Sequence, residues 1–431
     1  MVCPDCEKLV KLVEELRQRI AELEKRLALY ENAHTPPSRR RFPERKHDEH
    51  GGPLGRPPGF EGSTRPIPKP DRVEVVHASS CPECSGSLGE PAGYRSVIVE
   101  EIPEPQPVQV VEYKLACYVC PHCGQGVTAT HKDCPKEGVF GFRAMAQVAL
   151  LKYAGRLPFR LVCEALKRDY GLEITPATVL AVNGRVANSL EGEYEAIRQR
   201  IRISPVVHAD ETGLRVGGVQ YWIWIFVTDG QTLVVIRPSR AKKVLKEVLG
   251  DDFQGTIVCD GHKSYSNFTN NLQRCWAHLL REFKFASEKT KEATPIYRML
   301  KRLYRKLTHA LEGNPPNGER QRLSHNAELT LWRWLSKEWK EKPTIKAVGY
   351  LRNGMRHWLT FVTTPGMEPT NNRAERALRE HVVIRKIIGA LKNEKGTHNH
   401  EVITSVLTTM RQRQPDETKL RETLAQAIRG S

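Results

Sequence analysis

Two short apolar runs that each end on an aspartate constrain the fold of this chain more than any other feature. One occupies residues 206–210 and ends on Asp210, and the other occupies 256–260 and ends on Asp260. Between them the sequence predicts two more strands, rich in β-branched and aromatic residues, and one amphipathic helix, at 221–227, 233–236 and 241–249. This order of elements indicates an α/β domain with a sheet at its centre.

The matching positions of Asp210 and Asp260 indicate a metal site. If the first and last strands are neighbours, the two carboxylates lie side by side and repel each other, and a divalent cation is the usual remedy. The alternative is that each aspartate only caps a turn. Two aspartates in equivalent positions of one folding unit favour the metal site.

The net charge of +17 predicts an acidic polymer as partner. Most of the excess lies in residues 274–358, which hold 19 Lys and Arg against 8 Glu and no Asp. No run approaches the roughly 20 apolar residues of a membrane span, and the charged N-terminus does not resemble a signal peptide. We therefore expect a cytoplasmic, nucleoid-associated protein without a membrane partner.

Residues 1–33 carry a heptad repeat that predicts a coiled coil. Apolar residues recur at steps of three and four with charged residues between them, and they are Cys6, Leu9, Val13, Leu16, Ile20, Leu23, Leu27 and Tyr30. Such a helix would join at least two chains, whereas the alternative is a lone amphipathic helix packed on its own chain. Residues 34–75 are rich in proline, glycine and arginine, which predicts an extended basic linker.

Cysteine spacing predicts zinc. The chain has 11 cysteines, an odd number, and the pairing of several as C-x-x-C favours metal over disulfides. Two C-P-x-C turns joined by strand-like runs such as 108–115 predict a zinc ribbon at 76–136, with the ligands Cys81, Cys84, Cys120 and Cys123. Cys117 and Cys134 are spare thiols that could replace a ligand.

A third C-P-x-C turn, at Cys3 and Cys6, begins the heptad repeat. In a parallel pair of helices the two copies would supply four thiolates and form a second zinc site between the chains. An antiparallel pair would separate the two turns. The remaining alternative is a reduced terminus with two ordinary thiols.

Residues 137–203 are expected to be helical and to bind DNA. A helix at 160–170, a glycine-containing turn and a second helix opened by Thr175-Pro176 suit a helix-turn-helix. The second helix offers three candidate base or phosphate contacts, Thr178, Asn183 and Arg185. Any helical hairpin has a similar pattern, so a purely structural hairpin is the alternative.

The basic segment at 284–360 is predicted to be helical, with an interruption at 314–318. We expect it to lie along DNA and to contact phosphates through Arg298, Lys301, Arg302 and Arg305. Its tryptophans have a spacing that is more typical of a core than of base stacking. Just before this segment, Cys275 and His278 lie one helical turn apart, either as half of a zinc site or as core packing.

A third acidic residue, Glu375, follows the sequence Pro369-Thr370-Asn371-Asn372. Thr370 or Asn371 can cap a helix there, so Glu375 is expected in its first turn. A helix that crosses the sheet could deliver Glu375 between Asp210 and Asp260. The alternative is a surface salt bridge between Glu375 and Arg379, four residues on.

Four motifs together resemble those of the DDE transposases of the insertion sequence 66 family. They are His208–Gly213, Cys259–Tyr265, Cys275–His278 and Pro369–Arg376. The likeness covers nearly the whole chain, since members also have an N-terminal helix, a proline-rich linker and a zinc ribbon. It implies an RNase H-like α/β core at 204–283 and 361–412, divided by the basic helical insertion at 284–360 and followed by a C-terminal helix or tail at 413–431.

The resemblance also implies a chemistry. Asp210, Asp260 and Glu375 would hold two Mg²⁺ ions about 4 Å apart, which Mn²⁺ can replace. Water, and later the 3′-hydroxyl of the element, would attack a phosphodiester, so that the element's ends are cut and joined to target DNA. The DNA partners would be the terminal inverted repeats and the target, with His278, Asn371, Asn372 and Arg376 close to them.

Two other functions fit the same sequence. One is a regulator that binds DNA through the ribbon and the helix-turn-helix without catalysis, and the other is a metal-dependent nuclease that cuts selected DNA structures without joining them. The sequence leaves open the repeat sequence, the target preference, the activity of this copy, the need for accessory proteins, the number of subunits beyond two, and the roles of Cys117 and Cys134.

Overall fold

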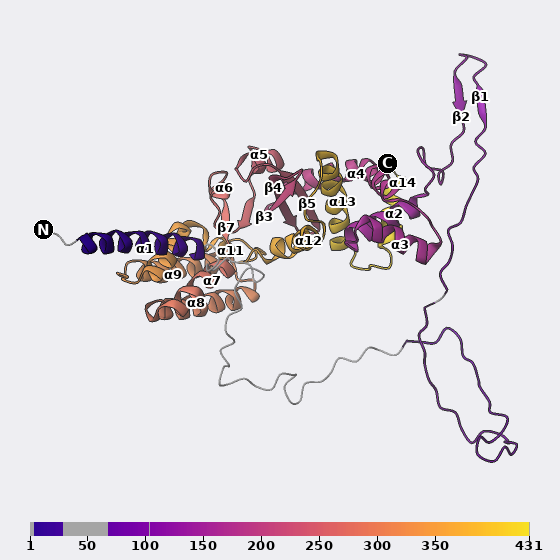
Figure 1. Cartoon of the computed structure of the whole chain (residues 1–431), viewed down its shortest axis with the longest axis horizontal. Helices are drawn as coiled ribbons and strands as arrows, with labels where there is room; N and C mark the ends of the chain where they lie inside the picture. The colour runs from indigo at the N-terminus through magenta and orange to yellow at the C-terminus, as the bar shows by residue number, and fades with distance from the viewer. Residues whose placement is uncertain (1–3, 29–67, 103, 431) are drawn as a thin grey trace.

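The computed structural model describes residues 4–28, 68–102 and 104–430, and only the backbone of 4–10 and 24–28. It is a mixed α/β structure in which a central sheet lies between a helical body on one side and a second helical body on the other (Figure 1). Most of the linker expected at 34–75 lies outside the described residues. No helix in the described part of the chain is long and apolar enough to cross a membrane.

The central sheet has five strands in the order β5-β4-β3-β6-β7. β3 pairs antiparallel with β4 and parallel with β6, while β4–β5 is antiparallel and β6–β7 parallel. The strands are β3 (Val206–Val216), β4 (Val219–Thr228), β5 (Gln231–Arg237), β6 (Thr256–Cys259) and β7 (Leu272–Arg274). The four predicted strands are confirmed as β3 to β6, as is the helix between them, α5 (Lys243–Leu249). The first and the last of these strands are neighbours, which was the condition for the predicted metal site, whereas β7 was not predicted.

Successive residues of a strand point to opposite faces of the sheet. In this sheet the residues on both faces are apolar, so both faces are covered by helices. One face, which includes Trp224 and Phe226, packs against α4 (Pro176–Arg202) and α13 (Glu394–Arg413). The opposite face, which includes Ile223 and Ile225, packs against α12 (Asn372–Ile388).

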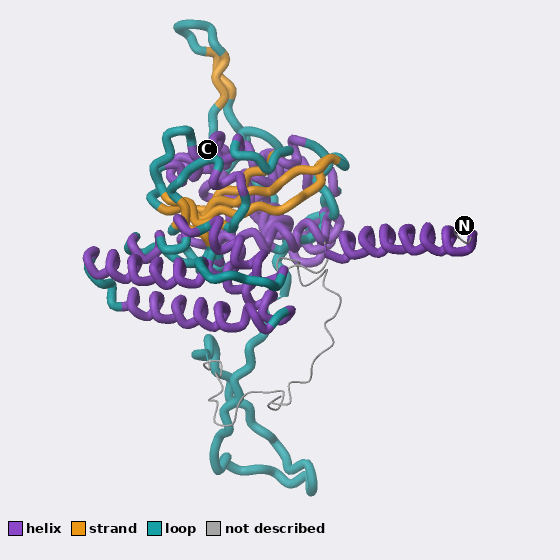
Figure 2. Tube along the Cα trace, turned by 90° about the vertical axis from the view of Figure 1, so that its left-hand side faces the viewer, coloured by secondary structure: helices purple, strands orange, loops and turns teal. Residues whose placement is uncertain are grey.

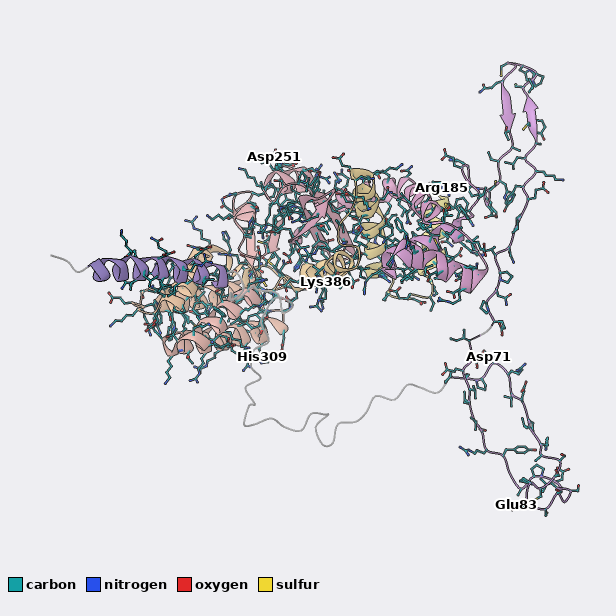
Figure 3. All side chains as sticks on the ribbon, in the orientation of Figure 1. Asp71, Glu83, Arg185, Asp251, His309 and Lys386 are labelled. Atoms are coloured by element: carbon teal, nitrogen blue, oxygen red, sulfur yellow. The ribbon has the colours of Figure 1, made fainter. Side chains whose placement is uncertain are left out.

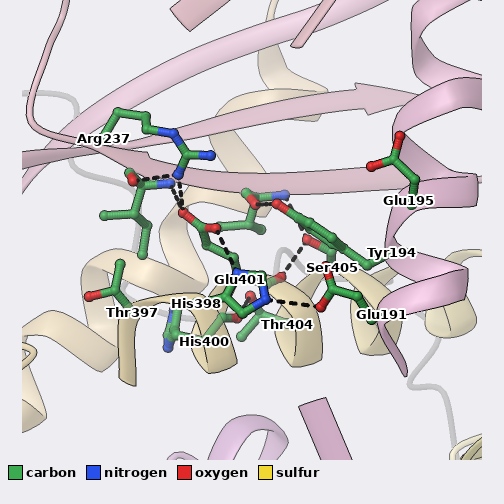
Figure 4. Close-up of polar contacts among 12 residues, drawn as sticks. Glu191, Tyr194, Glu195, Arg237, Thr397, His398, His400, Glu401, Thr404 and Ser405 are labelled. Atoms are coloured by element: carbon green, nitrogen blue, oxygen red, sulfur yellow. Dashed lines mark hydrogen bonds and ion pairs between the residues drawn. The ribbon is translucent and has the colours of Figure 1, made fainter. Parts of the chain in front are cut away.

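Helix α13 covers the open edge of the sheet (Figure 4). The N–H groups of β5 that face away from β4 donate to side chains of α13: Val234 to the Ser405 hydroxyl at 2.8 Å, Thr232 to the Thr409 hydroxyl at 3.0 Å, and Ile236 to the Glu401 carboxylate. The acceptors are four residues apart and the donors two apart. These steps match, since four helical residues and two strand residues both span about 6 to 7 Å.

The helical body beside α4 consists of α2 (Phe142–Ala149), a π-helical turn at Leu150–Ala154, α3 (Phe159–Tyr170) and α14 (Leu420–Arg429). The predicted hairpin between α3 and α4 is confirmed. Gly171 ends α3 with φ 63°, and the Thr175 hydroxyl caps α4 by accepting the N–H of Thr178 at 3.2 Å. However, α4 runs for 27 residues and lies in the core, so it is more than a recognition helix.

The segment between β7 and α12 folds around a second core, to which Val258 of β6 also belongs. Its helices are α7 (Trp276–Lys289), α8 (Thr294–Glu312), α9 (Asn317–Leu335), α10 (Lys342–Asn353) and α11 (Thr360–Thr363), with short 3₁₀ turns at Lys291–Ala293 and Met355–His357. Trp276 and Trp358 are fully buried there, as expected of core tryptophans, whereas Trp332 is half-exposed. Helix α7 packs into this core as well.

The chain from 68 to 139 is an extended arm with little buried surface. Its strands are β1 (Cys117–Val119) and β2 (Gly126–Thr128), which pair antiparallel. The strand expected at 108–115 is absent from the structure, and Val110 there is 92% exposed. That expectation was wrong because the alternating valines have no partner surface to pack on.

The N-terminal helix α1 (Pro4–Ala28) projects from the rest of the chain (Figure 2). Its described apolar side chains, which include Leu16, Ile20 and Leu23, are each more than 40% exposed. Within its described residues the helix is therefore amphipathic without a partner in its own chain.

We expect Ser405→Ala to destabilise the protein by about 1–3 kcal/mol, because the buried N–H of Val234 would lose its acceptor. The matched control is Thr404→Ala on the same helix, since the Thr404 hydroxyl donates only to the carbonyl of His400 one turn earlier. Urea denaturation should show a clearly smaller loss of stability for the control. Equal losses would mean that the covering of the edge adds no stability of its own.

Candidate active site

The register of β3 and β6 brings Asp210 and Asp260 to the same level of the sheet. Residues 206, 207 and 208 pair with 256, 257 and 258, an offset of 50, and the same offset separates the two aspartates. Asp260 directly follows β6, as expected, but Asp210 lies within β3 rather than at its end. The hairpin with β4 extends β3 to Val216, beyond the point where its pairing with β6 stops.

Negative charge converges on Asp210. Burial raises the pKa of Asp210 well above its ordinary value, and the nearby charges of Glu211, Asp260 and Glu375 raise it further. The few polar contacts present are from backbone: the Glu211 N–H donates to Asp210 at 2.9 Å and the His262 N–H to Asp260 at 2.8 Å. Carboxylates in this arrangement suit a hard divalent cation such as Mg²⁺.

Glu375 reaches the site because Asn371 fixes the start of α12. The Asn371 side chain donates to the carbonyl of Ala209 at 2.8 Å, next to Asp210, and its backbone N–H donates to the Cys275 sulfur at 3.2 Å. Glu375 follows in the first turn of α12, 3.4 Å from Nδ1 of His278. The ion pair of Glu375 that the structure describes is with His278 rather than with Arg379.

Asn371 is therefore an anchor rather than a DNA contact. It is completely buried, so the expectation that it touches DNA was wrong. Asn372 and Arg376 are exposed and remain predicted contacts. His278 is close to the acidic cluster, in line with the expected position of the C-x-x-H pair.

A buried network around Glu211 was missed by the sequence analysis. The Glu211 carboxylate accepts hydrogen bonds from Arg240 at 2.8 Å and from the Tyr265 hydroxyl, and His262 lies 3.9 Å away. Burial raises the pKa of Glu211, Asp260 raises it further, and Tyr265 and Arg240 act against both. The sequence offered one indication of this network, since Glu211 and Tyr265 belong to the motifs that contain Asp210 and Asp260. However, the residues around them in the sequence do not distinguish them from surface residues.

The residues of α4 expected to read DNA are engaged within the chain. Asn183 is buried, so its assignment as a DNA contact was wrong. Arg185 donates to the carbonyl of Glu137 at 3.3 Å, and Thr178 belongs to the helix cap. The reason is that α4 packs against α13, α2 and α3, so much of the helix faces protein.

The basic residues expected to contact phosphates lie on one exposed stripe of α8. Their spacing of three and four residues places them on the same side of the helix, and all are exposed: Arg298, Lys301, Arg302 and Arg305. The position of this stripe agrees with a phosphate-facing surface.

The two C-P-x-C turns have matching local structures but lie far apart. In each, the carbonyl of the first cysteine accepts a backbone N–H four residues on, from Ser85 to Cys81 at 2.9 Å and from Gly124 to Cys120 at 2.8 Å. Backbone N–H groups of each turn also lower the pKa of its first cysteine. Yet one turn lies near Glu83 and the other between β1 and β2, at opposite ends of the arm (Figure 3).

The expected four-thiolate site is therefore not assembled in this structure. The physical reason is that the arm buries too little to draw its ends together, so closure would depend on a metal. The zinc site expected at Cys3 and Cys6 lies outside the described side chains.

Comparison with known proteins gives a family match. The model described as "Transposase IS66 family" matches residues 137–399. Two similar proteins from Sinorhizobium fredii (strain NBRC 101917 / NGR234) are described as uncharacterized: y4qI, 24% identical over 67% of this chain, and y4hP, 21% identical over 80% of it. The alignments cover 60% of y4qI and 71% of y4hP.

We expect Mg²⁺ to raise the melting temperature of the protein, because it offsets the repulsion at Asp210. Asp210→Asn should abolish this rise, and in the absence of metal it should melt above the wild type, since it removes one of the charges that repel each other. The control is Asp251→Asn, which changes an exposed aspartate paired with Lys246. A rise of equal size in Asp210→Asn would exclude Asp210 as a metal ligand.

Proposed function

The chain belongs to the IS66 family of transposases, and from this premise we propose that it is a DDE transposase that cuts the ends of an insertion sequence and joins them to target DNA. The observation that carries the proposal is the convergence of Asp260 and Glu375 on Asp210. These acids come from three separate parts of the chain. A shared function in metal binding explains why they meet in spite of their repulsion.

We further propose that the catalytic core is RNase H-like. The support is the strand order β5-β4-β3-β6-β7, with the first acid on the central strand and the second after its parallel neighbour. Both aspartates then lie at the carboxyl ends of the paired parts of β3 and β6. Helix α12 supplies the third acid across that end of the sheet.

In this mechanism Asp210, Asp260 and Glu375 would hold two Mg²⁺ ions, and the chemistry that these ions would supply is activation of the attacking oxygen and stabilisation of the leaving oxygen. Asn371 fixes Glu375 relative to β3. The buried Glu211 network holds the short helix α6 (Lys263–Ser266), which follows Asp260, against β3 through Tyr265. The protein's task is thus to keep three acids in place while DNA enters.

Recognition of double-stranded DNA would come from positive charge outside the core. The exposed stripe on α8 lies in the segment that carries most of the net charge, and phosphate contacts of this kind provide affinity without reading sequence. We propose that the arm closes into a zinc ribbon and that α1 pairs with a second copy to bring two catalytic sites together. The support is the matched geometry of the two C-P-x-C turns and the unpartnered apolar side of α1.

Asp210→Asn, Asp260→Asn and Glu375→Gln should each lower Mg²⁺-dependent cutting and joining by about a thousandfold or more, because each removes a metal ligand but keeps the shape. A strand-transfer assay on DNA that carries the element's ends is the measurement. The control is Glu380→Gln, which lies on the same helix and pairs with Arg156. A fully active Glu375→Gln enzyme would remove Glu375 from the site.

The same assay separates the competing functions. Cutting without joining by the wild type would identify a nuclease. DNA binding with neither cutting nor joining would identify a regulator.

Neutralising Arg298, Lys301, Arg302 and Arg305 together should flatten the dependence of DNA affinity on salt, by up to about 0.9 log unit for each phosphate that the protein no longer neutralises. A control that replaces Lys392, Lys395 and Lys419, exposed lysines outside α8, should leave the slope nearly unchanged. If both variants have the wild-type slope, the α8 stripe faces only solvent.

Zinc should protect the arm from proteolysis, because closing the two turns around one ion folds residues that are otherwise exposed. Cys120→Ser should abolish this protection without affecting the core, whereas Cys163→Ser, in α3, should keep it. Limited proteolysis with and without Zn²⁺ is the measurement, with cleavage sites mapped between 68 and 139. Unchanged cleavage of the wild-type arm on adding Zn²⁺ would refute the ribbon.

A further inference from the structure

Three chemically different ligands meet beside the proposed catalytic centre. The Cys275 sulfur, a His278 ring nitrogen and a Glu375 carboxylate oxygen all lie within 4.8 Å of one another. Cys275 and His278 come from the start of α7, and Glu375 comes from the first turn of α12. Among the described residues this is the group of three whose candidate ligand atoms are all so close to one another.

The two helix starts are joined by backbone hydrogen bonds, so the group is held in advance. The Trp276 N–H donates to the carbonyl of Pro369 at 3.0 Å, and the Asn371 N–H donates to the Cys275 sulfur at 3.2 Å. The N–H of Leu279 donates to the carbonyl of Cys275 at 3.2 Å and keeps His278 one turn above the sulfur. A site of this kind does not have to be assembled by the ion.

The donor set differs from that of the acidic cluster. One sulfur, one nitrogen and one oxygen suit Zn²⁺ or Co²⁺, whereas Mg²⁺ prefers oxygen ligands only. Burial raises the pKa of Cys275 to about 11, and the N–H groups of Asn371, His278 and Ala277 act against that rise. A bound cation would displace the thiol proton outright.

Access is also suitable. The Cys275 side chain is fully buried, but the side chains of His278 and Glu375 are 14% and 31% exposed. An ion could therefore enter from the His278 and Glu375 side and keep a solvent-facing position for water. Three protein ligands with one open position are typical of zinc sites that are not purely structural.

We propose that Cys275, His278 and Glu375 form a second metal site, selective for a Zn²⁺-like ion, that withdraws Glu375 from the Mg²⁺ ions and so inhibits the enzyme. Binding converts the Cys275 thiol and Zn²⁺ into a zinc thiolate and releases one proton to solvent. The binding site stands on geometry alone, whereas the inhibition rests on the proposed function.

The first experiment counts metal. The full-length protein is titrated with Zn²⁺ against a chromophoric chelator, and the wild type is compared with Cys275→Ser and with Cys259→Ser, a buried cysteine outside the group. The arm cysteines contribute equally to all three proteins. We expect one ion fewer in Cys275→Ser and the full number in Cys259→Ser.

His278→Gln is the second variant, because this partly exposed side chain can be replaced even if Cys275→Ser fails to fold. It should weaken the same binding step by about tenfold or more. An unchanged zinc count and affinity in His278→Gln, or in folded Cys275→Ser, would overturn the site.

The second experiment measures Mg²⁺-dependent strand transfer at two zinc levels. The lower level is the number of Zn²⁺ ions per chain that Cys275→Ser binds, and the higher level is one ion per chain more. We expect strong inhibition of the wild type and at least about tenfold weaker inhibition of His278→Gln. Zinc bound at the site without inhibition would overturn the competition for Glu375. A wild type without Mg²⁺-dependent activity would refute the proposed function, while the metal count would still decide the site.

Discussion

The repulsion among the partly buried carboxylates around Asp210 is the constraint on which the arrangement of this fold depends. Asp210 lies on the central strand, and apolar layers on both faces of the sheet hold that strand in place. Strand β6 pairs parallel with β3 in a fixed register. The Asn371 side-chain amide donates to the carbonyl of Ala209, the residue before Asp210. The free energy gained by packing around β3 thus offsets a local repulsion that the site cannot avoid without a cation.

The helical segment between β7 and α12 begins and ends at this same place. It starts at Cys275, directly after β7, and returns to Asn371 at the start of α12, whose N–H binds the Cys275 sulfur. The Arg274 guanidinium lies 4.7 Å from the Tyr350 ring and 5.0 Å from the Trp358 ring, against Gly261 beside Asp260. A side chain at 261 would occupy the position of that guanidinium. A displacement of the insertion therefore cannot leave the acidic residues undisturbed.

Local patterns predicted those parts of the fold that local chemistry determines. The β-branched runs predicted the strands β3 to β6 but not β7, and the aspartates at the ends of two runs indicated a metal site that requires β3 and β6 to be neighbours. Thr175 and Gly171 predicted the ends of two helices. Residues whose surroundings come from distant segments could not be placed in this way. Asn183 and Asn371 are polar residues that are usually exposed, but both are buried here, and the Asn371 side chain binds the Ala209 carbonyl of β3. The strand prediction at 108–115 was wrong for the opposite reason. Alternating apolar residues form a strand only where another strand or an apolar surface packs against them, and this segment has neither.

The covering of β5 by α13 has a consequence for the order in which the chain is made. The acceptors Glu401, Ser405 and Thr409 follow β5 by more than 160 residues. While the ribosome synthesises the insertion, the outer edge of β5 has no α13 to cover it, and an open edge is a template for strands of other chains. Folding of the sheet is thereby tied to synthesis of almost the whole sequence, and chains that stop before α13 would expose an edge prone to aggregation.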